Sequence, residues 1–224
     1  MPTFHDPEQC PKKSHYGKHS VYFPSQKNQT QIVCDSALEA DYCVLLEFEA
    51  MVERYQSRPG IFKVNVEDHI LDYTPDFLVE TSELDYYTEV KPDFAKLSER
   101  VKSKLQAASR YFNNLGRPLR FADEYTIRRA EYLRNLKYLY LHSFKVGKDE
   151  GGDCMRQLEV VTFPIRLGDL LAKSNGPSTR SVYKAMFDRF IIFDLNQPLT
   201  ATTKLEGCND GHQHSESRRP IHAE

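Results

Sequence analysis

Pro75-Asp76 and Glu89-Val90-Lys91 are two short strings whose acids are separated by twelve residues, and both lie in segments rich in β-branched and aromatic residues. The polar break between the segments is centred near Ser82-Glu83, so antiparallel pairing places residue i opposite roughly 165 − i. Asp76 then lies opposite Glu89, with Cβ atoms about 5 Å apart, where like charges repel. A positive charge is therefore expected between the two carboxylates.

Lys91 can supply this charge, because it lies two residues after Glu89 and so on the same face of its strand. Two interpretations stay open on the residues alone. The ammonium can neutralise ordinary acids at a strand edge, or the carboxylates can hold a divalent metal ion beside the lysine. Mg²⁺ prefers oxygen ligands and keeps several waters, and a metal-activated water can attack a phosphodiester. A proline before Asp76 favours an edge or bulge, where sites are often built.

Further elements are predicted around these strings. Ser36 and Glu39 have the spacing of a capping box, and the apolar residues that follow predict a helix over residues 36–56. Glu39 then has two alternative roles, to cap this helix through Ser36 or to reach the paired acids. A meander of three strands is predicted over residues 61–66, 69–79 and 86–90.

A basic amphipathic helix is predicted over residues 94–114, because apolar residues recur at three- and four-residue steps before Gly116. A returning strand over residues 118–122 and a helix over residues 127–142 follow. The basic face of the first helix is either a solvated surface or, because this helix directly follows the paired acids, a contact for DNA phosphates. The residues expected to bind DNA are Lys96, Lys102, Lys104 and Arg110.

The order of elements predicts an α/β core of α+β character, in which helices flank a small mixed sheet. This core is expected over residues 35–148, with residues 147–153 as a linker. Residues 149–205 show two short helices and a strand pair, the pattern of a small winged-helix-like module. Residues 1–34 are expected to form an irregular arm and residues 206–224 a disordered tail, because both are poor in periodic apolar residues.

Composition narrows the class of protein. The chain has 224 residues, 40% of them hydrophobic and 28% charged, and no apolar run approaches 18 residues, so neither a membrane span nor a signal peptide is expected. Five scattered cysteines without zinc-site spacing predict a reduced, cytoplasmic protein. Residues 35–94 carry four basic and fifteen acidic groups, whereas residues 95–148 carry thirteen and four. This separation of charge has two explanations. The acidic block can hold metal ions while the basic block binds phosphates, or both blocks can be ordinary solvated surfaces.

The paired strings resemble the PD-(D/E)xK nuclease motif. A longer resemblance, over about residues 30–145, is to the TnsA family of transposon endonuclease subunits. It rests on the strings Ser36-Ala37-Leu38-Glu39-Ala40-Asp41-Tyr42, Leu45-Leu46-Glu47-Phe48-Glu49, Tyr73-Thr74-Pro75-Asp76-Phe77 and Glu89-Val90-Lys91-Pro92. The C-terminal module, with Asp194-Leu195 and Pro198-Leu199, is more loosely similar to the partner-binding region of that family. A chain this short is typical of the compact forms found in guide-RNA-directed transposons.

The resemblance implies a restriction-endonuclease-like core and a role for each residue of the site. Asp76 would be the central metal ligand and Glu89 a second, and Val90 would contribute its backbone carbonyl. Lys91 would position or activate the attacking water. Glu39, from the preceding helix, would complete the metal site. The expected metal is Mg²⁺, with Mn²⁺ as a substitute.

The resemblance also implies an activity and partners. A TnsA-like subunit would hydrolyse the 5′ strand of double-stranded DNA at transposon ends, while the DDE transposase TnsB cuts and joins the 3′ ends and the AAA ATPase TnsC regulates the assembly. It would act in the bacterial cytoplasm, at the nucleoid when assembled. Two alternatives stay open: a stand-alone restriction-type or junction-resolving endonuclease, and a non-catalytic adaptor between TnsB and TnsC. The adaptor has no need for opposed carboxylates beside a lysine.

Overall fold

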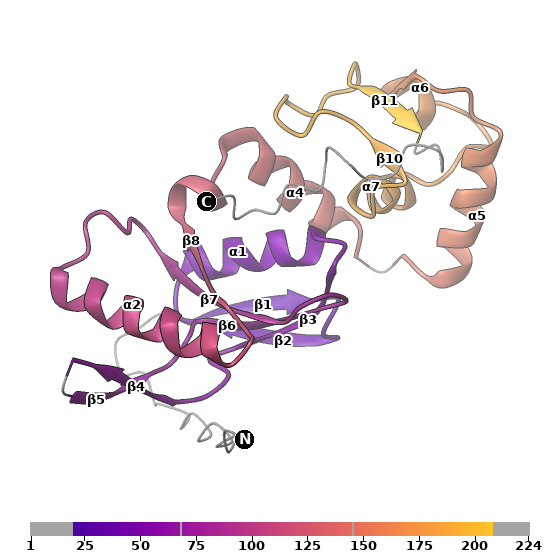
Figure 1. Cartoon of the computed structure of the whole chain (residues 1–224). Helices are drawn as coiled ribbons and strands as arrows, with labels where there is room; N and C mark the ends of the chain where they lie inside the picture. The colour runs from indigo at the N-terminus through magenta and orange to yellow at the C-terminus, as the bar shows by residue number, and fades with distance from the viewer. Residues whose placement is uncertain (1–19, 68, 145, 208–224) are drawn as a thin grey trace. The chain divides into compact units, whose positions relative to one another are not determined.

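A computed structural model of the chain describes residues 20–67, 69–144 and 146–207, which fall into two units divided between Ile127 and Arg128 (Figure 1). The α+β prediction is confirmed in its coarse form, because the first unit has a mixed sheet flanked by helices. No helix within these ranges is long and apolar enough to cross a membrane. Residues 1–19 of the predicted arm and residues 208–224 of the predicted tail lie outside the described part.

The elements are labelled in chain order. The first unit contains β1 (Val21–Ser25), β2 (Thr30–Cys34), α1 (Ala37–Phe48), β3 (Val52–Ser57), β4 (Phe62–Val66), β5 (His69–Tyr73), β6 (Phe77–Thr81), β7 (Tyr86–Lys91), α2 (Glu99–Asn114), β8 (Leu119–Asp123) and α3 (Glu124–Ile127). The second unit contains α4 (Ala130–His142), α5 (Lys148–Glu159), β9 (Ile165–Arg166), α6 (Leu167–Leu171), α7 (Thr179–Phe187), β10 (Ile191–Ile192) and β11 (Lys204–Gly207).

A four-stranded sheet in the order β3-β6-β7-β8 forms the centre of the first unit. β8 runs parallel to β7, and the other neighbours are antiparallel. A parallel neighbour needs a crossover connection, which α2 provides. The predicted register of β6 and β7 is confirmed, because Phe77 pairs with Thr88 and Leu78 with Tyr87.

Helices cover both faces of this sheet. The ring of Tyr42 in α1 lies 5.6 Å from that of Phe77, and its hydroxyl lies 3.2 Å from Thr88 Oγ1. The ring of Phe112 in α2 lies 4.3 Å from that of Tyr87. Because Tyr87 and Thr88 are consecutive in β7, their side chains leave the sheet on opposite faces, and so α1 and α2 lie on opposite faces.

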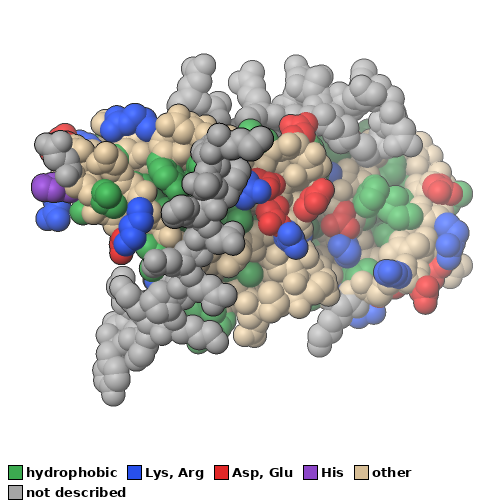
Figure 2. All heavy atoms as spheres, turned by 60° about the horizontal axis from the view of Figure 1, so that its bottom comes forward, with side chains coloured by type: hydrophobic (Ala, Val, Ile, Leu, Met, Phe, Trp, Pro, Cys, Tyr) green, Lys and Arg blue, Asp and Glu red, His purple; other side chains and the backbone are tan. Residues whose placement is uncertain are grey.

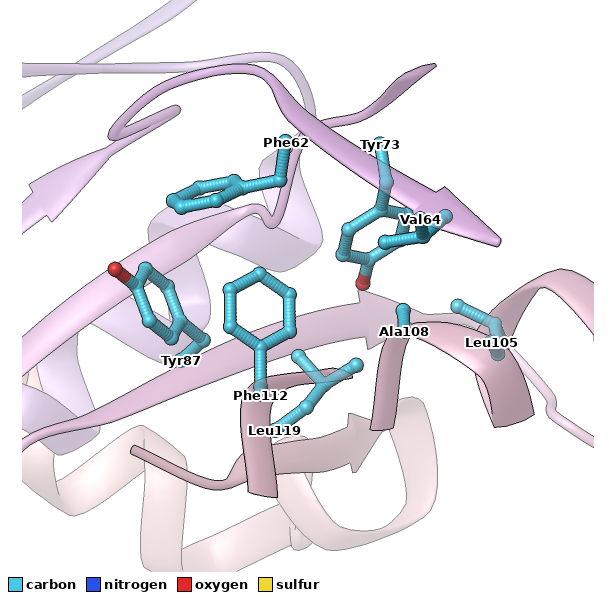
Figure 3. Close-up of a cluster of buried hydrophobic side chains, with 8 residues drawn as sticks. All are labelled: Phe62, Val64, Tyr73, Tyr87, Leu105, Ala108, Phe112 and Leu119. Atoms are coloured by element: carbon cyan, nitrogen blue, oxygen red, sulfur yellow. The ribbon is translucent and has the colours of Figure 1, made fainter. Parts of the chain in front are cut away.

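The hairpin of β4 and β5 is inserted between β3 and β6 and packs on α2. Phe62 and Val64 of β4 and Tyr73 of β5 meet Phe112 in a buried cluster (Figure 3). Phe62 lies edge-on to Phe112, with ring centroids 4.9 Å apart. This packing fixes the end of β5, and with it the loop that leads to Asp76.

Replacing Phe112 with Leu is expected to lower the free energy of unfolding by roughly 1.5–4 kcal/mol. The aromatic contacts with Phe62, Tyr87 and Tyr73 are lost, and each such contact contributes roughly 0.5–1.5 kcal/mol beyond burial, while the leucine fills part of the volume. Urea denaturation followed by circular dichroism measures the change. An unaltered midpoint would show that the cluster does not hold the hairpin to α2.

Two predicted boundaries near the site are wrong. The helix predicted to residue 56 ends at Phe48, and β3 follows after a short turn. Val52 and Tyr55 are buried three residues apart, which fits a helix, but a register irregularity between Val52 and Arg54 gives strand β3 the same spacing. The strand predicted over residues 69–79 is divided before Phe77, because Pro75 has no N–H to donate.

The predicted meander is also wrong, because β4 and β5 pair with each other in a separate sheet and β3 takes the place beside β6. The irregular arm predicted through residue 34 ends in the hairpin of β1 and β2. The buried positions of this hairpin alternate along each strand, and Ser25 donates a hydrogen bond to the carboxylate of Glu47 in α1. Its other face carries Tyr22, Pro24 and Val33 beside polar residues, so the sequence lacks the alternation of apolar and polar residues that marks a strand.

The second unit begins earlier than the predicted boundary after residue 148. Tyr140 of α4 packs against Phe187 of α7, with ring centroids 5.2 Å apart, so α4 belongs to this unit. The predicted linker over residues 147–153 lies largely in α5, whose first turn holds two acids that favour a helix N-terminus. A three-stranded sheet in the order β10-β11-β9 includes β9, a strand too short to be predicted.

Candidate functional site

Asp76 lies directly before β6 and is attached to both neighbouring strands. Its backbone carbonyl accepts a hydrogen bond from the N–H of Arg58, just after β3, at 2.8 Å. Its carboxylate Oδ2 accepts a hydrogen bond from the N–H of Val90 in β7 at 2.7 Å. Asp76 is one residue before the Phe77–Thr88 pair, so it faces Glu89 as the sequence predicts.

Three oxygens converge on the ammonium of Lys91. Its Nζ lies 2.6 Å from Glu89 Oε1, 3.4 Å from Asp76 Oδ2 and 3.0 Å from the carbonyl oxygen of Val90. The side chain of Glu89 is 8% exposed and that of Asp76 is 21% exposed. The positive charge expected between the acids is thus the ammonium itself. We call Asp76, Glu89, Val90 and Lys91 the acid–lysine cluster.

Charge and burial shift the protonation of this cluster. Burial raises the pKa of Asp76 to about 7, and the charge of Glu89 adds to the effect. Burial alone would lower the pKa of Lys91, but the carboxylates of Asp76 and Glu89 more than offset it, so the pKa of Lys91 is raised. Lys91 is therefore a cation at neutral pH, whereas Asp76 titrates there.

Glu39 caps α1. Its Oε2 accepts a hydrogen bond from the N–H of Asp35 at 2.8 Å, and its Oε1 accepts one from the hydroxyl of Ser36 at 3.0 Å. The Ser36 hydroxyl accepts in return from the N–H of Glu39 at 3.1 Å. The capping interpretation is confirmed. Burial raises the pKa of Glu39, the charge of Asp35 raises it further and the charge of Lys91 lowers it. The role of Glu39 as a metal ligand stays a prediction.

Two residues beside the cluster were given no role from the sequence. Tyr73, at the end of β5, donates a hydrogen bond to Glu89 Oε2 at 2.6 Å. The side chain of Arg58 pairs with Asp35 Oδ2 at 3.1 Å while its backbone holds Asp76. Arg58 has a φ of 48°, an uncommon conformation outside glycine. Neither residue's contact follows from a local sequence pattern. The contact of Tyr73 joins the end of β5 to β7, and the backbone contact of Arg58 joins the residue after β3 to the residue before β6, so both depend on tertiary packing.

The four residues expected to bind DNA are distributed differently. Lys96 precedes α2 and pairs with Asp93, Lys102 pairs with Glu99, and Arg110 is exposed. Lys104 is half-buried, with its Nζ 5.6 Å from the ring centroid of Tyr73, the residue that donates a hydrogen bond to Glu89. On the face drawn in Figure 2, Lys and Arg side chains stand beside Asp and Glu side chains rather than in one basic area.

The donor set of the cluster suits a hard cation. Within residues 20–67, 69–144 and 146–207, no group of three or more His, Cys, Asp and Glu side chains could hold a metal ion. Mg²⁺, however, is commonly held by one or two carboxylates together with other oxygens and waters. Asp76 and Glu89 supply the carboxylates and Val90 a carbonyl, and their oxygens already surround one positive charge.

Comparison of the chain with models of known protein families found no matching family, and comparison with curated proteins found no match either.

Proposed function

We propose that the chain is a divalent-metal-dependent DNA endonuclease, a subunit of a heteromeric transposase that hydrolyses the 5′ strand at transposon ends. The observation that carries the proposal is the convergence of oxygens from Asp76, Glu89 and Val90 on one cationic atom, Lys91 Nζ. Two opposed carboxylates at strand ends cost stability unless a cation joins them. Phosphodiester hydrolysis would require two carboxylates at this position, which explains an arrangement that otherwise lowers stability.

The arrangement of elements supports the proposed fold family. Apart from the inserted β4–β5 hairpin, the first unit runs from α1 in the order α1, β3, β6, β7, α2 and β8, and the cluster lies where β6 begins and β7 ends. This order is compatible with a restriction-endonuclease-like PD-(D/E)xK core. In the second unit α5, β9, α6 and α7 precede β10 and β11, and the sheet order β10-β11-β9 is compatible with a winged-helix-like module.

Asp76, Glu89 and the carbonyl of Val90 would hold the metal ion, Mg²⁺ or its substitute Mn²⁺. Such an ion supplies Lewis-acid stabilisation of the phosphoryl group and a more acidic water when it is bound. The hydrogen bond from the Val90 N–H keeps the carboxylate of Asp76 turned toward β7. The buried position of Glu89 excludes water from one side of the site.

Lys91 acts as a cation in this proposal. Because its pKa is raised, the side chain donates hydrogen bonds and does not serve as a base at neutral pH. It is 28% exposed, so it can turn from the carboxylates toward a phosphate or a water at the surface. There it would stabilise the negative charge that develops on the phosphoryl group.

The transposase setting rests on the resemblance of residues 30–145 to TnsA subunits. TnsB and TnsC would then be partners, and the setting would be the bacterial cytoplasm. Sequence specificity would belong to TnsB, because phosphate contacts such as those proposed for Lys104 position DNA without reading its bases.

Metal binding is expected to weaken as pH falls through 7. A proton on Asp76 competes with the metal, and its pKa of about 7 means that most of the protein is protonated there at pH 6 and ionised at pH 8. Calorimetric titration with Mn²⁺ is therefore expected to give an affinity about tenfold weaker at pH 6 than at pH 8. An affinity constant across this range would contradict the assignment of Asp76 as a ligand.

Strand-specific cleavage tests the function itself. The purified chain, with Mg²⁺ and the cognate DDE transposase, is expected to release the 5′ strand of a labelled duplex that contains a transposon end. Palindromic duplexes and four-way junctions, without the transposase, serve as comparison substrates. Cleavage of those substrates alone would favour a restriction-type or junction-resolving enzyme, and cleavage of no substrate under any of these conditions would favour the adaptor.

A further inference from the structure

We propose that Tyr73 is a positioning residue that fixes the carboxylate of Glu89 for metal binding. The inference rests on the proposed function, since it concerns a ligand of the same site. It adds Tyr73, the last residue of the inserted β4–β5 hairpin, to which no role was assigned from the sequence. The consequence is that the hairpin belongs to the site as well as to the hydrophobic core.

The hydroxyl of the buried Tyr73 is a hydrogen-bond donor to Glu89. The ring is buried beside Val64 in the cluster of Figure 3, 5.9 Å from the ring of Phe112, and the residue is 3% exposed. The hydroxyl donates to Glu89 Oε2 at 2.6 Å. Burial and the charge of Glu89 hold the pKa of Tyr73 well above its usual range, so the hydroxyl keeps its proton and acts as a donor.

The two oxygens of Glu89 are held by two different donors. Oε2 accepts from Tyr73 and Oε1 contacts the ammonium of Lys91. These contacts come from different elements, β5 and β7, so they fix the rotation of the carboxylate about its own axis. Oε1 is therefore directed toward Asp76 and Lys91, where a cation would bind. Without the hydroxyl, the buried Oε2 would lack this donor, and the carboxylate could rotate to satisfy it with Lys91.

Metal-binding side chains commonly depend on such partners, whose loss lowers metal affinity by about 10–100-fold. The full chain with Tyr73→Phe is expected to bind Mn²⁺ in calorimetry about 10–100-fold more weakly than the wild type at the same pH. Tyr111→Phe is the matched control, because its ring packs in the same region against Phe62 and Phe112. This control should bind Mn²⁺ like the wild type.

A double-mutant cycle separates positioning from general stability. If Tyr73 acts through Glu89, Tyr73→Phe should add no loss of Mn²⁺ affinity in a Glu89→Gln background. Losses that add in the double variant would overturn the inference, as would wild-type affinity in Tyr73→Phe.

A second measurement needs no substitution. The hydroxyl proton of Tyr73 should be protected from exchange in proton NMR and should shift when Mg²⁺ is added. The absence of any such shift would overturn the inference even if Tyr73→Phe failed to fold.

The outcomes distinguish this inference from the proposed function. Wild-type protein that binds Mn²⁺, together with Asp76→Asn protein that does not, supports the metal site whatever Tyr73→Phe shows. Wild-type affinity in Tyr73→Phe then overturns the positioning role alone. Failure of the wild type to bind Mn²⁺ overturns both.

Discussion

Asp76→Asn is expected to abolish cleavage of the 5′ strand, with a loss of at least about 10³-fold in rate. A metal ion contributes several kcal/mol of transition-state stabilisation, and each 1.36 kcal/mol corresponds to about tenfold in rate. The amide keeps the hydrogen bond from the Val90 N–H through its oxygen, so the loop before β6 should be preserved. Partner binding and 3′-end joining should therefore continue, and products should change from cut-and-paste to co-integrates.

The same substitution is expected to stabilise the protein in the absence of metal. The raised pKa of Asp76 means that its contribution to stability is present below about pH 4, the ordinary pKa of an Asp, and is lost as pH rises through 7. Asn imitates the protonated form at every pH. The difference between a pKa of about 7 and the ordinary value near 4 limits the stabilisation gained by Asp76→Asn to about 4 kcal/mol. The substitution also removes the partly exposed contact between Asp76 and Lys91, which makes the gain smaller.

Thermal melting at pH 8 with EDTA should therefore show Asp76→Asn more stable than the wild type by about 1–2 kcal/mol. Phosphodiester cleavage and melting are measured on the same preparation. Normal 5′ cleavage by this variant would reject the assignment of Asp76, whatever the melting curve shows.

Lys91→Met is expected to lower the free energy of unfolding by about 2–3 kcal/mol without metal, because removal of one partner leaves two largely buried carboxylates without their cation. Mn²⁺ should restore most of this loss, since the metal takes the place of the ammonium among the same oxygens. The variant should nevertheless cleave at least about 10²-fold more slowly, because the donor to the phosphoryl group is absent.

Lys96→Met is the matched control for this experiment. Lys96 is 85% exposed and pairs with Asp93 outside the cluster, so its removal should leave both stability and the response to Mn²⁺ unchanged. If Lys91→Met were as stable as the wild type without metal, or gained no more stability from Mn²⁺ than the control, the cluster would not be the cation site.

The sequence predicted the pairing that creates the site. The polar break near residue 82 and the period of two were sufficient to place Asp76 opposite Glu89, and the Phe77–Thr88 pair confirms that register. The capping of α1 by Glu39 was also visible, because the Ser36–Glu39 spacing depends on local backbone geometry alone. Local rules succeed where the contacts are close in the chain or follow a single turn.

Long-range packing explains the errors. The spacing of Val52 and Tyr55 fits a helix as well as a strand with a register irregularity, and the pairing with β6 decided the outcome. The separation of β4 and β5 from the main sheet depends on their packing against α2, which no local pattern records. For the same reason the contact of Tyr73 with Glu89, sixteen residues away, could not be anticipated.

Crystals of the chain grown with Mn²⁺ give the most direct test of the central claim. Anomalous diffraction is expected to place a manganese ion within about 2.3 Å of carboxylate oxygens of Asp76 and Glu89 and of the carbonyl oxygen of Val90. The ammonium of Lys91 should be displaced from between the acids. An anomalous map without manganese at this position, with Lys91 still between Asp76 and Glu89 at saturating Mn²⁺, would contradict the account.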